Sequence, residues 1–403
     1  MTSAIADFVP HPETLAGSKK MRVAWLFPMM RRTHYWQPVF REFTSLVADN
    51  TVFVGCWGGF AAGYEGSFKL RVLNGGRPLV LKKKEKEEQY DSALFWAPAS
   101  ILVELARFRP DVIFTTGFSA WTVCALVQKL LARSRVIVLW DGNSVHWKSQ
   151  ISKARHLQRK LMAPFLDFVV SNMCEGVEYM RRSLSIPDHK LLSHPYQVAD
   201  LAILDTEISG EKLPGSRPIF LFVGSIEARK GWRYLVAAAR ALVCEGINRF
   251  SVVFVGAGPE EKKLRVAIRE CGVQTVAFHV GPVPYRRMAS CYRNADVFVF
   301  PTMDDVWGLV LLEAMAFGKP VICSRFAGAR EMVADEENGF LADPRNVEFL
   351  AACMRRFIDD PSLIERFGAR SRELIAPYTP RRAAQVLASV ALGTWDRKGR
   401  ATV

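Results

Sequence analysis

Residues 296–324, DVFVFPTMDDVWGLVLLEAMAFGKPVICS, hold a strand, a loop, a helix and a second strand in quick succession. The run DVFVFP is almost wholly apolar, as in strands that are buried on both faces of a parallel sheet. A polar loop with Asp304 and Asp305 comes next. Gly308 then opens an apolar helix that Gly318 closes, and PVICS follows as another strand. A strand–helix–strand unit of this kind builds a parallel sheet.

The same alternation fills most of the chain. MRVAWLF begins it at Met21, and PIFLFVG restarts it at Pro218. The stretch 208–217, ISGEKLPGSR, lacks periodicity and predicts a linker. We therefore expect an α/β protein with two Rossmann-like, doubly wound parallel-sheet domains, at 21–207 and 218–378, after a disordered tail at 1–20. Ligands of open parallel sheets bind at the carboxyl ends of the strands, so two such domains facing across a cleft can enclose a ligand.

The composition limits the classes of function. The chain has 403 residues and a formal net charge of +14. Residues 1–207 carry 26 basic and 19 acidic side chains, and residues 208–403 carry 28 and 21, so each half has a charge of +7. This even spread argues against a nucleic-acid-binding face, where basic residues would concentrate. It suits anionic substrates and peripheral contact with an anionic membrane.

The cysteines, the histidines and the N-terminus bear on location and on metals. The eight cysteines are scattered, with no CxxC pair and no clustered histidines. This pattern favours reduced thiols and predicts no metal site. The N-terminus lacks the apolar core of a secretory signal, and no segment reads as a membrane span. We expect a cytoplasmic protein, with possible peripheral attachment to the inner face of the plasma membrane.

The helix that Gly308 opens predicts a binding site. The backbone N–H groups of Gly308, Leu309 and Val310 lie at its positive end, which suits a diphosphate. Glu313, over one turn further on, is suited to bind the two hydroxyls of a ribose. Asp305, just before the helix, can accept a hydrogen bond from a sugar hydroxyl. These residues together predict a nucleotide-sugar site.

The same residues resemble the retaining glycosyltransferases of the family 4 type, whose mark is E-x7-E followed by A-M-A-x-G-x-P-V. Asp305 and Glu313 occupy the two acidic positions, with Asp in place of the first Glu. FVGSIEARKGWRYLVAAA resembles the family's first strand–loop–helix, and VVFVGAGPEEKKL its second glycine turn. FHVGPVPYRRMASCYRNADVFVFPT resembles the base-binding strand and contains Gly281. The resemblance runs from Phe220 to about Pro361.

The resemblance implies the roles of further residues. Lys230 would be the catalytic, donor-phosphate lysine. Ser225 stands where many members have an arginine, and Arg229 would supply the missing cation. Asp141, in WDGNS, stands where many members have a histidine after a first-domain strand, and it is a catalytic candidate. The family also implies that the helix at 379–395 crosses back to the first domain.

The implied protein is a GT-B hexosyltransferase. It would transfer a hexose from GDP-mannose or a UDP-hexose to a saccharide or polyprenyl-linked acceptor in surface polysaccharide synthesis. No cofactor or metal is expected, because cationic side chains neutralise the leaving diphosphate. Two alternatives remain: a nucleotide-sugar epimerase of the same architecture, and a nucleotide-sugar-binding protein with weakened catalysis, suggested by Asp305 and Ser225. An exported solute-binding protein is disfavoured because no export signal is present.

Overall fold

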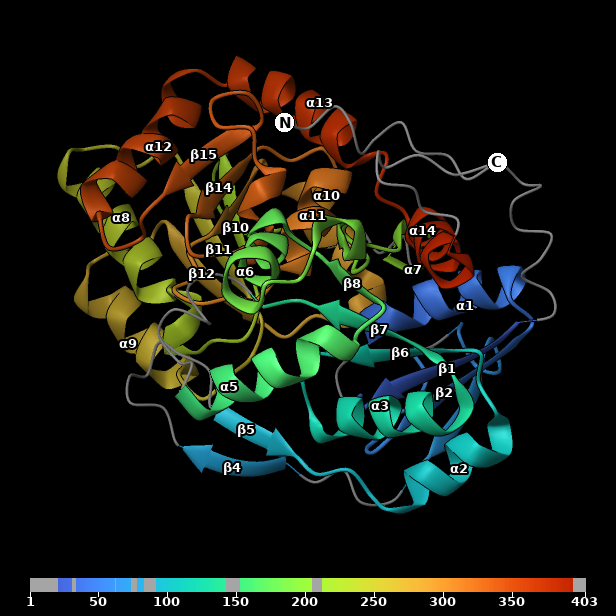
Figure 1. Ribbon diagram of the computed structural model, residues 1–403. Coiled ribbons are helices and arrows are strands. Elements are labelled where there is room, and N and C mark those ends of the chain that lie inside the picture. The colour runs from blue at the N-terminus through green and yellow to red at the C-terminus, as the bar shows by residue number, and fades with distance from the viewer. Residues whose placement is uncertain are drawn as a thin grey trace. The chain divides into compact units, whose positions relative to one another are not determined.

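The computed structural model describes residues 21–30, 34–61, 63–73, 78–82, 92–142, 153–204 and 212–393 (Figure 1). The predicted tail at 1–20 lies outside this part of the chain. The described residues form two compact units. The first takes in the described residues up to Val198 and those from Pro377 to Gly393, and the second takes in the described residues from Ala199 to Ala376.

Among the described residues, the first unit contains a seven-stranded parallel sheet with the order β3-β2-β1-β6-β7-β8-β9. Apolar runs form its inner strands, and Trp25 and Phe114 are fully buried there. An antiparallel hairpin, β4–β5, lies apart from this sheet in the strand pairing. The strands are β1 (Arg22–Phe27), β2 (Asp49–Val54), β3 (Lys69–Val72), β4 (Pro78–Lys82), β5 (Ser92–Phe95), β6 (Val112–Thr116), β7 (Arg135–Trp140), β8 (Phe168–Ser171) and β9 (Leu191–Ser193).

Helices cover both faces of the first sheet. One buried cluster combines strand residues with those of α2 (Ser100–Phe108), α3 (Ala120–Ala132) and α6 (Cys174–Leu184). On this side, α5 (Lys153–Met162) continues into the short helix η3 (Ala163–Phe165). A second cluster combines the other strand face with α1 (Gln37–Leu46) and α14 (Pro380–Leu392). The C-terminal helix α14 therefore packs in the first unit, where Arg135 Nη1 donates to the Ala391 carbonyl at 2.8 Å.

The second unit contains, within its described residues, a six-stranded parallel sheet of order β12-β11-β10-β13-β14-β15. Its strands are β10 (Ile219–Val223), β11 (Ser251–Val255), β12 (Ala277–Gly281), β13 (Val297–Phe300), β14 (Val321–Ser324) and β15 (Gly339–Ala342). Its main helices are α8 (Trp232–Cys244), α9 (Glu261–Glu270), α10 (Met288–Asn294), α11 (Leu309–Ala316), α12 (Val347–Asp359) and α13 (Ser362–Ile375). The predicted α/β fold with two doubly wound parallel sheets is confirmed.

The change from one unit to the other lies earlier than the predicted linker. The second unit begins at Ala199, and its short helix α7 (Leu201–Leu204) packs on the turn η6 (Tyr285–Arg287). Of the predicted linker, residues 212–217 are described and belong to this unit, where Arg217 pairs with Asp296. Local composition shows where periodicity is lost, but it does not show which unit a segment contacts. Among the described residues, no helix is both long and apolar enough to cross a membrane.

Candidate donor site

Two loops at one edge of the second sheet bring the predicted site residues together. The first follows β10 and contains Ser225, Arg229 and Lys230. The second follows β13 and contains Asp305 and Gly308. Strands β10 and β13 are neighbours, while β11, next in the chain, pairs on the other side of β10. The loops therefore lie at the point where the strand order reverses, which is where open α/β sheets bind ligands.

Backbone contacts hold the two loops against each other. A Cβ on Gly231 would lie 1.8 Å from the Pro301 carbonyl oxygen, so the chain passes too closely there for any side chain. Gly231 also has a φ of 69°, a left-handed conformation that glycine adopts at little cost. Met303 N donates to the Arg229 carbonyl at 2.8 Å, and Thr302 Oγ1 donates to the same carbonyl at 3.1 Å. The position of Lys230 is therefore fixed by the β13 loop.

Opposite charges meet across the loops. Lys230 Nζ forms an ion pair and hydrogen bond with Asp305 Oδ2, and Arg229 Nη1 lies 3.8 Å from the same oxygen. Arg229 also donates to the Asp304 carbonyl at 2.7 Å and to Glu227 Oε1 at 2.6 Å. Its guanidinium thus braces the two loops rather than standing open as an extra phosphate cation. Lys230 is the more accessible of the two cations, with its side chain 15% exposed against 8% for Arg229.

Gly308 begins the helix as predicted. It has a φ of 108°, and a Cβ placed on it would lie 2.6 Å from the Phe300 ring. Leu311 N makes the first bond of the helix, to the Gly308 carbonyl at 2.9 Å. The amides of Leu309 and Val310 precede that bond, so the helix itself gives them no acceptor. These amides and Lys230 supply the positive groups beside the β13 loop.

Glu313, which we expected to bind the hydroxyls of a ribose, is a buried carboxylate. It is only 2% exposed, because α11 packs with buried apolar side chains on either side of it. Its two oxygens accept hydrogen bonds from the hydroxyls of Tyr285, at 3.0 Å, and Tyr292, at 2.6 Å. Burial raises the pKa of the Glu313 carboxyl, while the two tyrosine hydroxyls act to lower it. A carboxylate oxygen can accept more than one hydrogen bond, so a ribose hydroxyl that reached Glu313 would add to the bonds from the tyrosines or replace them.

Sequence reasoning did not pick out these tyrosines as functional. Tyr285 lies in η6 and Tyr292 in α10, seven residues apart along a continuous helical stretch. A spacing of seven puts both side chains on one helix face. That spacing was readable in YRRMASCYRNA, but nothing local shows that their hydroxyls meet a carboxylate on another helix.

The remaining predicted donor residues lie at the same sheet edge. Ser225 is in the turn after β10, where Ile226 N donates to the Ala257 carbonyl at 3.0 Å. Gly281 ends β12, and its carbonyl accepts from Gly256 N at 2.9 Å. Ser225 thus follows β10 and Gly281 ends β12, and β11 lies between these two strands in the sheet.

Asp141 belongs to the first unit, directly after β7. It accepts a hydrogen bond from Gln197 Nε2 at 3.4 Å, and burial raises the pKa of its carboxyl. The tryptophans nearby are core residues: Trp36 stacks on Tyr196 with ring centroids 5.1 Å apart, and Trp140 is 6% exposed. A buried carboxyl beside an amide can still exchange a proton, so Asp141 remains a candidate.

The part of the chain that matches a known protein family falls within the second unit. Residues 205–374 match the family described as Glycosyl transferases group 1. A D-inositol 3-phosphate glycosyltransferase 2 from Catenulispora acidiphila is 33% identical over 174 residues, which is 41% of this chain and 41% of the relative. An alpha-D-kanosaminyltransferase from Streptomyces kanamyceticus is 27% identical over 243 residues, 59% of this chain and 61% of the relative.

The group 1 relatives are matched over less than two thirds of their own length. A solved structure matches over more: that of Anabaena HepE in complex with UDP covers 92% of this chain and 99% of its own, with a TM-score of 0.72 and 15% identity. A structure of the same protein with UDP-glucose is also similar. At this identity the likeness establishes the fold alone, and that fold is the GT-B fold that we expected.

Proposed function

We propose that this protein is a retaining glycosyltransferase that transfers a hexose from a nucleoside-diphosphate sugar to a saccharide or lipid-linked acceptor. The observation that carries the proposal is the interlock of the β10 and β13 loops, which sets Lys230 and the start of α11 at the switch point of the second sheet. The match of residues 205–374 to the family described as Glycosyl transferases group 1 supports it. The donor would be a UDP-hexose or GDP-mannose.

The site residues suit the departure of a nucleoside diphosphate. When the sugar–phosphate bond breaks, negative charge grows on the diphosphate, and a fixed ammonium with free helix amides stabilises that charge without rearranging. Lys230 and the amides of Leu309 and Val310 would do this work. Glu313 would hold the ribose hydroxyls, and Asp305 would orient the donor sugar. We propose that no metal is needed, because these groups already offer the positive charge.

The Lys230–Asp305 pair has a consequence for donor binding. Asp305 already neutralises Lys230, so an incoming phosphate must compete with a carboxylate for the ammonium. The competition would release Asp305 toward the sugar hydroxyls, which links the binding of phosphate to the placement of the sugar. If the carboxylate instead keeps the lysine, donor would bind weakly without turnover. This specific pair therefore supports, as a second candidate, a binding protein with weakened catalysis.

One experiment separates these functions. The full chain is incubated with UDP-glucose, UDP-galactose or GDP-mannose, and nucleoside-diphosphate release is followed while calorimetry measures binding. Slow release with a preferred donor supports a transferase, since these enzymes hydrolyse donor when no acceptor is present. Binding without release supports the weakened protein. If neither binding nor release occurs with any of the three donors, the proposal is wrong.

We also propose a cytoplasmic location with peripheral contact to an anionic membrane. The positive charge of both halves of the chain and the lipid-linked acceptor of the proposed reaction support it.

A further inference from the structure

Helices α3, α5 and η3 of the first unit carry large apolar side chains that are exposed to solvent. On α3 these are Leu130 and Leu131, with 75% and 77% of their surface exposed. On α5 and η3 they are Leu157, Leu161 and Phe165, at 57%, 64% and 54%. We call these five residues the α3–α5 surface. Clustered exposure of large apolar side chains on a protein surface marks a binding site.

The inner side of α5 explains why its leucines point outward. Arg159 is buried, with its guanidinium 4.8 Å from the centre of the Trp140 ring and Nη1 donating to the Tyr179 hydroxyl at 3.1 Å. Leu157 and Leu161, one turn apart, lie on the side of the helix opposite Arg159. The helix is thus anchored by a cation on aromatic rings and shows its leucines to solvent.

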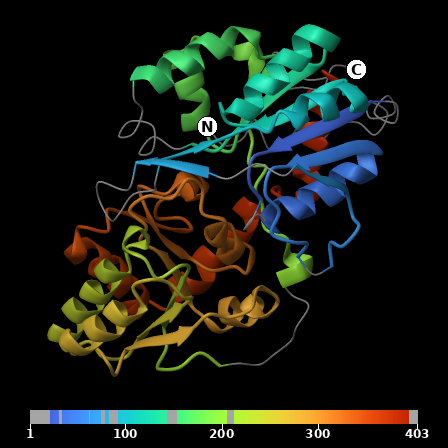
Figure 2. The ribbon, with the colours of Figure 1, turned by 90° about the horizontal axis from the view of Figure 1, so that it is seen from below.

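The helices α3 and α5 are tied together at this surface. Lys129 of α3 donates to the Phe165 carbonyl at 2.8 Å and pairs with Asp167 at 2.6 Å. Gln158 of α5 donates to the Phe118 carbonyl, just before α3, at 3.4 Å. Figures 1 and 2 show both helices on the same side of the first sheet. The exposed leucines of α3 and α5 therefore belong to one face.

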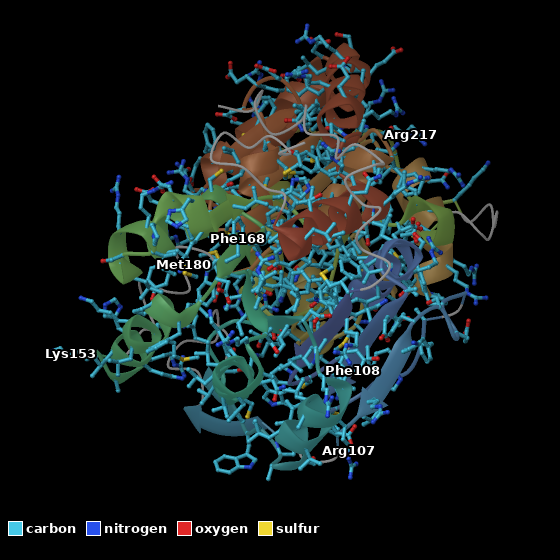
Figure 3. The ribbon with its side chains drawn as sticks, turned by 45° about the vertical axis from the view of Figure 1, so that its right-hand side comes forward. Arg107, Phe108, Lys153, Phe168, Met180 and Arg217 are labelled. Atoms are coloured by element: carbon cyan, nitrogen blue, oxygen red, sulfur yellow. The ribbon has the colours of Figure 1, made fainter. Side chains whose placement is uncertain are left out.

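Basic side chains lie along α5 beside these apolar side chains. Neither α3 nor α5 contains an aspartate or glutamate, while α5 contains Lys153, Arg155 and Lys160, and Arg133 follows α3. Lys153 and Lys160 are exposed, and Figure 3 shows Lys153 at the outer edge of the first unit. An amphipathic helix with basic side chains beside exposed leucines is typical of a helix that lies in a membrane interface.

We propose that the α3–α5 surface binds the surface of an anionic lipid bilayer. The leucines and Phe165 enter the boundary of the acyl chains, and Lys153 and Lys160 attract the acidic headgroups. A second copy of the chain fits less well, because two such faces would bring like charges together. This inference deepens the membrane contact proposed above, but its test involves no sugar transfer, so it can fail or succeed apart from the proposed activity.

The test is sedimentation of the full chain with phosphatidylcholine vesicles, with or without phosphatidylglycerol. We expect binding to the anionic vesicles that weakens with salt. Leu157→Ser with Leu161→Ser should lower the partition constant about tenfold or more, because each leucine leaves the hydrocarbon. Lys153→Gln with Lys160→Gln should lower it about fivefold per lysine at low salt.

Matched variants in the second unit serve as controls. Phe349→Ser removes an apolar side chain that is 45% exposed on α12, and Lys262→Gln removes an exposed lysine on α9. Both should bind vesicles like the unchanged protein. Equal binding of the leucine variant and the unchanged protein overturns the inference, as does equal binding to neutral and anionic vesicles. A dimer in solution that the leucine variant abolishes, without vesicle binding, would assign the surface to a second copy instead.

Discussion

Replacing Lys230 by methionine should destabilise the second unit through the carboxylate that it leaves behind. The side chains of Lys230 and Asp305 are 15% and 9% exposed, so the pair is close to the buried limit. Removing one partner of a buried ion pair costs about 3–5 kcal/mol, against about 1 kcal/mol or less at the surface. Arg229 stays 3.8 Å from Asp305 Oδ2 and still attracts it. We therefore expect a loss of about 2–3 kcal/mol.

The loss is best measured where it arises. Hydrogen exchange of peptides from the β10 and β13 loops reports local opening, and urea denaturation of the full chain reports the wider effect. The double variant Lys230→Met with Asp305→Asn removes both charges. It should be more stable than Lys230→Met alone, with a coupling of about 1–3 kcal/mol. Lys262→Met, at an exposed lysine of α9, should change little.

The same variant should also lose function. Removing one preorganised charge from a leaving-group site lowers turnover about 10²- to 10³-fold. Donor hydrolysis by Lys230→Met is compared with the double variant at equal folded fraction. If Lys230→Met keeps its stability and its turnover, the lysine has neither of these roles. If the effects of the two substitutions on the free energy of unfolding simply add, Lys230 and Asp305 do not act as a pair.

Four further outcomes are expected. Gly308→Ala should lower the free energy of unfolding, measured by urea denaturation, by about 1–3 kcal/mol or more, because it adds a clash with Phe300 to the strain of a positive φ. The control Gly272→Ala has a φ of 68° and no atom within 4 Å of its Cβ, so it should cost about 1 kcal/mol. Equal losses of stability in the two variants would refute the clash. Burial raises the pKa of Glu313, so its contribution to stability is fully present below its ordinary pKa and is lost as pH rises through the raised value; Glu313→Gln should flatten that decline in denaturation midpoints, and an unchanged slope would contradict it. Tyr292→Phe removes a hydroxyl that lowers this pKa, so the decline should move to higher pH and donor binding should weaken in calorimetry. Donor hydrolysis should be equal in EDTA and in Mg²⁺, and a chelator-sensitive rate would contradict the cationic site.

The fold was largely readable because buried parallel strands leave a strong pattern. PIFLFVG and DVFVFP are apolar runs, and each is followed by a glycine or proline turn and an amphipathic or apolar helix. The hairpin β4–β5 and the helices α12 and α13 were not anticipated. The helices α12 and α13 bury one side and leave charged residues on the other. This amphipathic pattern was present in the sequence, but these helices lie beyond the motif on which the family resemblance rests.

The residues of the site could be predicted from the sequence, but the pairing of their charges could not. Lys230 and Asp305 are 75 residues apart, and the pattern of alternating strands predicts only that their loops share one sheet edge. Which strands are neighbours decides the rest: β10 next to β13 brings the lysine to the aspartate. We expected a cluster with an excess of positive charge, whereas Asp305 and Glu227 offset Lys230 and Arg229.

The two acidic residues of the motif, Asp305 and Glu313, therefore have different partners and different roles. Asp305 pairs directly with the Lys230 ammonium, and Arg229 Nη1 lies 3.8 Å from the same carboxylate oxygen. Among the described residues, Glu313 accepts hydrogen bonds from two tyrosine hydroxyls, and burial raises the pKa of its carboxyl. A diphosphate entering beside Lys230 would therefore act first on Asp305, and only a ribose reaching the Tyr285 side of α11 would act on Glu313. A nucleoside diphosphate should engage both carboxylates, whereas inorganic pyrophosphate should engage Asp305 alone, so only the former should shift the pH dependence assigned to Glu313.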